Sequence, residues 1–144
     1  MKALIIFALL AVSTVTFAQE TIKAEKEDSR STILDLVVGV KQTYSQTSGL
    51  EAKVVELLAG DGMNAERMVL VLNTGYGDTK IFELSTMMVE VTRITFLDKD
   101  LIVINYTQDD FDQAGDSIQV NRSITIKVGR NADNTLSDTI TVTP

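Results

Sequence analysis

The chain has 144 residues, which suits one domain with a sizeable core and is too short for two. It has no histidine and no cysteine, so Ser-His-Asp and Cys-His catalysis and the nitrogen and sulfur ligands of zinc and copper sites are excluded. Its net charge of −7 disfavours nucleic acid and anionic membrane surfaces as partners.

The first 18 residues have the organisation of a secretory signal peptide. Lys2 gives a positive start, residues 3–12 are an unbroken apolar run, and Thr16 and Ala18 form a small-x-small cleavage site. The apolar run is about half of the roughly 20 residues that a membrane-spanning helix needs. We therefore expect a periplasmic or secreted protein, cleaved near Ala18, that does not span the membrane.

Two segments of different character follow the cleavage site. Residues 19–31 carry heavy mixed charge and one large apolar residue, Ile22, which predicts a flexible charged leader or a short frayed helix. Residues 32–44 alternate, with Leu34 and Val40 in one apolar phase. This alternation predicts a strand that is well buried in its first half.

The segment 50–59 allows two interpretations. Leu50, Ala52 and Val54 alternate as in a strand that forms a hairpin with the preceding one. The segment as a whole also contains good helix formers, and Gly60 stands where a helix C-terminus favours glycine. Because a ten-residue helix is short without tertiary support, we favour the strand and keep a short helix as the alternative.

The middle of the chain reads as three short strands. Residues 67–73 are apolar on both faces, which is typical of a central strand, and residues 80–84 follow after a turn with Gly75 and Gly77. In residues 89–97 the apolar phase changes between Val91 and Ile94. One extra residue near Thr92 and Arg93 would reconcile the two phases, which predicts a β-bulge there.

An acidic loop is expected between two of the later strands. Residues 101–106 form a strand, and residues 108–116 form a loop rich in aspartate. Asp110, Asp112 and Gly115 match three positions of a calcium-binding loop, but two further ligand positions hold Ala114 and Asn121. We therefore interpret 109–116 as a solvated loop, with a weak calcium site as the alternative, and predict no metal site.

The clearest strand of the chain spans residues 117–128. Its even positions are β-branched and apolar apart from Arg122, and its odd positions are polar, as in a strand with one buried and one wet face. Arg122 indicates where this long strand passes the edge of its sheet. A last strand follows at 136–143, with Leu136, Ile140 and Val142 facing inward.

The predicted fold is all-β. About eight strands separated by mostly short turns indicate an antiparallel meander that forms one small barrel or sandwich domain over residues 32–144. An outer-membrane barrel is disfavoured because several strands are shorter than the 9–11 residues needed to span and aromatic residues are few.

No residue pattern predicts catalysis, since pairs among the 20 acidic residues carry no specificity and no cofactor motif occurs. We predict a non-catalytic domain that binds a protein partner through its loops, as an inhibitor or envelope accessory protein. Tyr76 and Phe111 are the candidate partner-binding residues, because an aromatic side chain in a polar turn either packs back onto the core, which is the commoner case, or stands out as an anchor for a partner. The alternative is a carrier of a small apolar ligand in a barrel cavity, suggested by strands 67–72 and 101–104 that are apolar on both faces.

Overall fold

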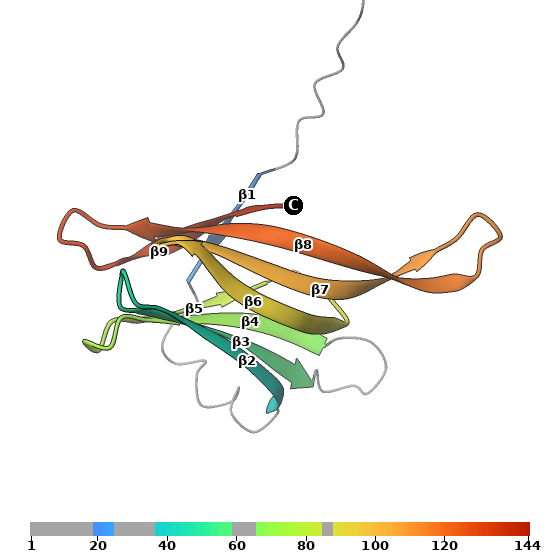
Figure 1. The fold of residues 1–144 in the computed structure, drawn as a ribbon, viewed down its shortest axis with the longest axis horizontal. Coiled ribbons are helices and arrows are strands. Elements are labelled where there is room, and N and C mark those ends of the chain that lie inside the picture. Colours follow the sequence, from blue (N-terminus) through green and yellow to red (C-terminus); the bar gives the residue numbers. More distant parts are fainter. Residues whose placement is uncertain (1–18, 25–36, 59–65, 85–87) are drawn as a thin grey trace, which may run out of the picture.

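The computed structural model describes residues 19–24, 37–58, 66–84 and 88–144, and these residues form nine strands and no helix. The strands form two antiparallel sheets that face each other (Figure 1). One sheet has the order β1-β9-β8-β7-β6 and the other β2-β3-β4-β5. The strands are β1 (Glu20–Lys23), β2 (Val37–Ser45), β3 (Leu50–Leu58), β4 (Glu66–Asn73), β5 (Thr79–Glu83), β6 (Glu90–Asp98), β7 (Leu101–Phe111), β8 (Ser117–Arg130) and β9 (Leu136–Thr143).

The all-β antiparallel fold is confirmed, and of the two predicted forms of closure the sandwich is the observed one. Strands β2 to β5 form one meander, and strands β6 to β9 form the other. The two sheets are not closed into a barrel, because each keeps two edge strands. The edge strands are β1 and β6 in the five-stranded sheet, and β2 and β5 in the four-stranded sheet.

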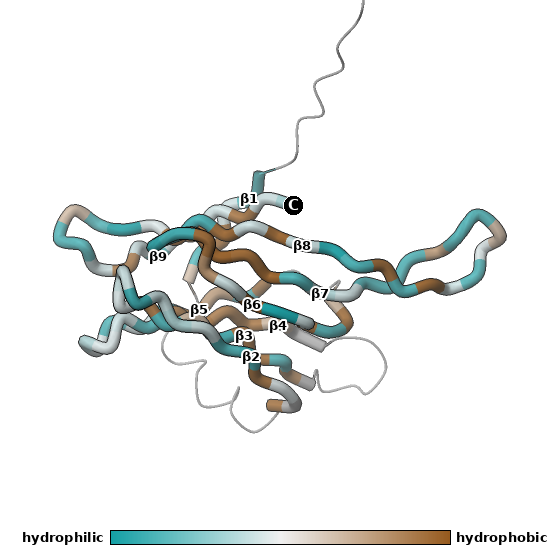
Figure 2. The backbone as a smooth tube through the Cα atoms, viewed as in Figure 1, coloured by the Kyte–Doolittle hydropathy of each residue, from teal (hydrophilic) through white to brown (hydrophobic). Residues whose placement is uncertain are grey.

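The core lies between the two sheets and is made by alternate residues of facing strands (Figure 2). Because side chains in a strand alternate between faces, each strand contributes every second residue to this interior. The fully buried side chains include Phe82 of β5, Met68 of β4 and Ile102 of β7. The inward positions predicted in the last strand are confirmed: Leu136, Ile140 and Val142 are 1%, 1% and 8% exposed.

Strand β4 is apolar on both faces because both of its faces pack. Leu70 and Leu72 point into the core, whereas Val69 packs with Leu57 and Ile81 in a second apolar cluster. The pattern therefore reflects a central strand, as predicted, and not the lining of a barrel cavity.

Two local predictions are confirmed. Residues 50–58 form a strand, so the helix alternative for 50–59 is wrong within the described residues. The register of β6 against β7 shifts between Val91 and Arg93, which is the predicted position of the bulge.

Three predictions differ from the structure. Glu20–Lys23 form strand β1 on β9, whereas this part of 19–31 was expected to be a flexible leader or frayed helix. Tertiary pairing decides this, since β9 offers an open edge that four residues are enough to cover. Residues 1–18, 25–36, 59–65 and 85–87 lie outside the described part of the chain. The predicted signal peptide and most of the strand half that was predicted to be buried, in 32–44, lie among them.

Within that segment, Val40 shares the apolar phase of Leu34 but is 51% exposed. The reason is that Val40 lies in the same phase of β2 as Tyr44, which is 60% exposed, and this phase points away from the core.

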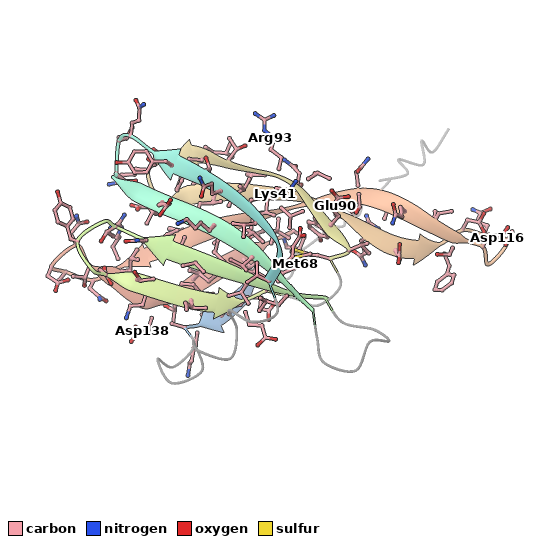
Figure 3. The ribbon with its side chains drawn as sticks, turned by 90° about the horizontal axis from the view of Figure 1, so that it is seen from below. Lys41, Met68, Glu90, Arg93, Asp116 and Asp138 are labelled. Carbon is pink, nitrogen blue, oxygen red and sulfur yellow. The ribbon has the colours of Figure 1, made fainter. Side chains whose placement is uncertain are left out.

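The third difference concerns the acidic loop. Residues 108–111 continue strand β7 and pair with β8 up to Phe111, so the loop is shorter than the predicted 108–116. Pairing with β8 overrides the low strand propensity of the two aspartates at 109 and 110. The paired strands form a projecting hairpin, here called the arm (residues 107–123), which extends past the rest of the sandwich in both Figure 1 and Figure 3.

Candidate functional site

Tyr76 stands at the tip of a stiff turn between β4 and β5. The flanking Gly75 and Gly77 have φ of 79° and 82°, a backbone region that favours glycine. The Gly75 N–H donates to Asn73 Oδ1 at 2.7 Å, and the Thr74 N–H donates to the Asp78 carbonyl at 3.2 Å. The turn is thus held by its own hydrogen bonds while the Tyr76 side chain is 96% exposed.

Asp78 fixes this turn to the facing sheet. Its Oδ2 accepts the Leu136 N–H at 2.6 Å, at the start of β9. A second link joins the neighbouring β2–β3 turn to the same sheet, where Ser48 Oγ donates to the Lys99 carbonyl at 2.7 Å. The two turns are therefore anchored to one scaffold.

Tyr44, Glu51 and Asn73 form a row across three strands next to Tyr76. In the register of the sheet, Tyr44 of β2 lies opposite Glu51 of β3, and Glu51 lies opposite Asn73 of β4. The row is on the outer face, because the adjacent Ala52 belongs to the core and successive side chains alternate. Tyr44 is 60% exposed.

These residues line a cleft of about 510 Å³. The cleft, here called the tyrosine cleft, is lined by Tyr44, Gly49, Glu51, Asn73, Thr74, Gly75 and Tyr76. Glu51 forms a salt bridge with Lys53, whose Nζ lies 3.1 Å from Glu51 Oε2. Two aromatic rings, a carboxylate and an amide thus surround one opening. This set offers apolar contact and hydrogen bonding but no nucleophile paired with a base.

Phe111, the other candidate, lies on the arm at the opposite end of the molecule. In Figure 1 the β7–β8 tip and the β4–β5 turn are at opposite ends of the long axis. Phe111 is 73% exposed and lies opposite Ser117 in the hairpin. The structure therefore does not bring Tyr76 and Phe111 into one site.

The aspartates of the arm are used within the hairpin. Asp112 Oδ1 accepts the N–H groups of Ala114 and Asp116 at 2.8 and 2.9 Å, and Asp110 Oδ2 lies 3.2 Å from Arg122. In the part of the chain that the structure describes, no group of three or more acidic side chains is arranged to hold a metal ion. The geometry gives no support to the calcium alternative.

Sequence reasoning identified Tyr76 but missed Tyr44. Tyr44 was treated as the end of a buried strand, and its partners across the sheet depend on a register that local pattern does not reveal. The available signal was its position: an aromatic residue close to the polar turn at residues 46–49.

The fold and the cleft define a two-sheet antiparallel β-sandwich with an aromatic cleft at one end and a projecting hairpin at the other. A scan of protein-family models and searches of curated proteins and solved structures found no match. Among the described residues, no helix has the length and hydropathy to cross a membrane.

Proposed function

We propose that this protein is an exported, non-catalytic binding domain that holds a protein partner in the tyrosine cleft. The observation that carries the proposal is that two exposed tyrosines, Tyr44 and Tyr76, line one cleft. Tyrosine is enriched among the residues that dominate binding energy at protein interfaces. Tyr76, which is 96% exposed, offers a partner its whole ring and its hydroxyl.

The stiffness of the turns favours binding. A side chain that is already held in its bound position loses less conformational entropy on association. Hydrogen bonds to Asn73 and Asp78 hold the backbone around Tyr76, so on binding the side-chain torsions of Tyr76 remain to be fixed but the backbone of its turn does not. A loop of a larger protein that inserts one side chain between the rings fits this arrangement, as expected for an inhibitor or an accessory protein of the cell envelope.

The barrel carrier is not proposed, because its premise was a closed barrel with a ligand cavity. The sheets are open at their edges, and the space between them is occupied by core side chains such as Phe82, Leu70 and Ile104.

The test is capture of envelope proteins from the source organism on immobilised protein, quantified by mass spectrometry. The double variant Tyr44→Ala, Tyr76→Ala should reduce recovery of the captured partner. Truncation of each anchor is expected to cost about 2 kcal/mol, or roughly 30-fold in Kd. The melting temperature should stay unchanged, since both side chains are exposed.

Phe111→Ala is the matched control, because it removes an exposed aromatic ring at the other end of the molecule. It should leave recovery of the cleft partner unchanged. Equal recovery by the wild type and the double tyrosine variant would refute the proposal.

A further inference from the structure

Half of β8 has no neighbour on its outer side. β8 runs from Ser117 to Arg130, but β9 pairs with it only as far as Thr125, which lies opposite Thr143 at the end of β9. From Ser117 to Ser123, β8 therefore pairs with β7 alone among the described residues. We call this seven-residue stretch the β8 edge.

The hydrogen-bond pattern of the hairpin identifies which backbone groups the β8 edge exposes. At the tip, the Asp112 N–H donates to the Asp116 carbonyl at 2.9 Å, which makes these two residues a hydrogen-bonded pair. In an antiparallel ladder bonded and non-bonded pairs alternate, so Ile118, Val120 and Arg122 bond to β7. The backbone groups of the intervening residues point outward: Ser117, Gln119, Asn121 and Ser123.

The β8 edge carries one feature that protects exposed strands from pairing, the charged side chain of Arg122, and lacks the others. Natural edges are short, bulged, or carry lysine or proline. The β8 edge has no lysine and no proline, and its register against β7 is continuous. Its one charged side chain, Arg122, is paired with Asp110.

The four strands at the sheet edges, β1, β2, β5 and β6, are short or irregular. β1 and β5 have 4 and 5 residues. β6 has two register shifts, and β2 has one. The contrast singles out the β8 edge as a surface suited to receive a strand.

The charge and shape of the arm define the strand it would receive. Asp109, Asp110, Asp112 and Asp116 lie on the arm, with Arg122 as its one cation, and Asp116 marks its far end in Figure 3. Ile118 and Val120 lie on the same face of β8 as its core side chains. Ile118 is 39% exposed and Val120 is partly exposed. A second copy would bring the same acidic side chains together, whereas a basic strand with alternating apolar residues complements both features.

We propose that the β8 edge binds an extended basic segment of a partner protein by β-strand addition. Outward amides and carbonyls of Gln119 and Asn121 form the new ladder, and Ile118 and Val120 pack against apolar side chains of the added strand. The exposed carboxylates of Asp109 and Asp116 attract its cations. This surface is separate from the tyrosine cleft, and the proposal does not depend on the function proposed there.

The test uses the fluorescein-labelled peptide Lys-Val-Thr-Val-Thr-Val-Lys and the whole protein at low salt, with binding followed by fluorescence anisotropy. The basic peptide should bind at least about tenfold more tightly than the same peptide with glutamate in place of lysine. Amide hydrogen exchange at Gln119, Asn121 and Ser123 should slow on binding, while the amides of Ile118 and Val120, already bonded to β7, should change little.

Two controls separate strand addition from simple charge attraction. Asn121→Pro removes an outward N–H without removing a bond to β7, so it should weaken binding about tenfold relative to Asn121→Ala. If the proline variant melts lower than the alanine variant, a peptide N-methylated at its two threonines, which lie opposite Gln119 and Asn121 in an antiparallel ladder, provides the same comparison on the wild type. Equal affinity of the methylated and unmethylated peptides, or of the proline and alanine variants, would overturn the proposal.

The oligomeric state shows whether a second copy of the chain, instead of a partner protein, occupies the β8 edge. Sedimentation of the wild type at micromolar concentration should show a monomer. A dimer that Asn121→Pro converts to monomer would mean that a second copy occupies the β8 edge, and would overturn the proposal as well.

Discussion

Asp133 organises the turn between β8 and β9 through a single carboxylate oxygen. Its Oδ1 accepts the hydroxyl of Thr135 at 2.6 Å and the backbone N–H of Thr135 at 3.1 Å. Both hydrogen bonds favour the ionised carboxylate, so the pKa of Asp133 lies below its ordinary value, with the Thr135 hydroxyl as the larger cause. The neighbouring Asn134 adopts a φ of 68°, a left-handed conformation that asparagine tolerates.

Thr135→Val should raise the pKa of Asp133, because it removes the hydroxyl donor and keeps the side-chain shape. A carboxyl whose folded pKa is depressed stabilises the fold above its unfolded pKa, and this contribution is lost as the pH falls through the folded pKa. In the variant this contribution should therefore be smaller, and its loss should be complete at a higher pH. NMR titration of the Asp133 carboxyl carbon measures the shift, and Thr141→Val is the control. An unchanged pKa would contradict the assigned cause.

At the scale of strands, the two sheets are linked by a side chain that reaches a backbone amide. β6 is an edge strand, so the amides on its outer side have no ladder partner. The Val91 N–H, on a residue that is 0% exposed, donates to Glu56 Oε1 of β3 at 3.1 Å. Gly39 of β2 leaves room for this carboxylate, since a Cβ there would collide with Glu56 Oε2.

Glu56→Ala should lower the free energy of unfolding by about 1–3 kcal/mol, because the desolvated Val91 N–H loses its acceptor. Glu56→Gln keeps an acceptor oxygen and should recover most of that loss. Urea unfolding of the three proteins provides the measurement, with the exposed Glu90→Ala as a control that should change stability by less than about 0.5 kcal/mol. Equal stability of Glu56→Ala and the wild type would show that water replaces Glu56.

Over the whole molecule, the first described strand pairs with the last. Ile22 of β1 lies opposite Ile140 of β9 and packs against the core, so the larger sheet is complete only when both ends of the described chain meet. The tyrosine cleft and the arm lie at opposite ends of this sandwich, which leaves two separate surfaces for partners.

Refolding from urea should take milliseconds to seconds, because sandwiches are dominated by pairings between distant parts of the chain. A phase of tens of seconds limited by proline is not expected, since the one proline is the terminal Pro144. Stopped-flow fluorescence of the tyrosines measures the refolding rate and would reveal a slow phase. A dominant phase slower than about ten seconds would contradict this expectation.

The amino-acid sequence by itself determined most strands of this protein. Alternating β-branched residues predict the pleated chain at 117–128 and 136–143, and the phase change between Val91 and Ile94 predicts the bulge. These features are local, because a side-chain period of two follows from strand geometry alone.

Only the tertiary structure decided what those strands build. Whether the sheets close, which strands are edges, and how far β7 extends all depend on pairing between distant residues, which local polarity does not encode. The same holds for the candidate surfaces. The row of Tyr44, Glu51 and Asn73 exists only through the register of three strands, and the β8 edge exists only through the register that places Thr143 opposite Thr125.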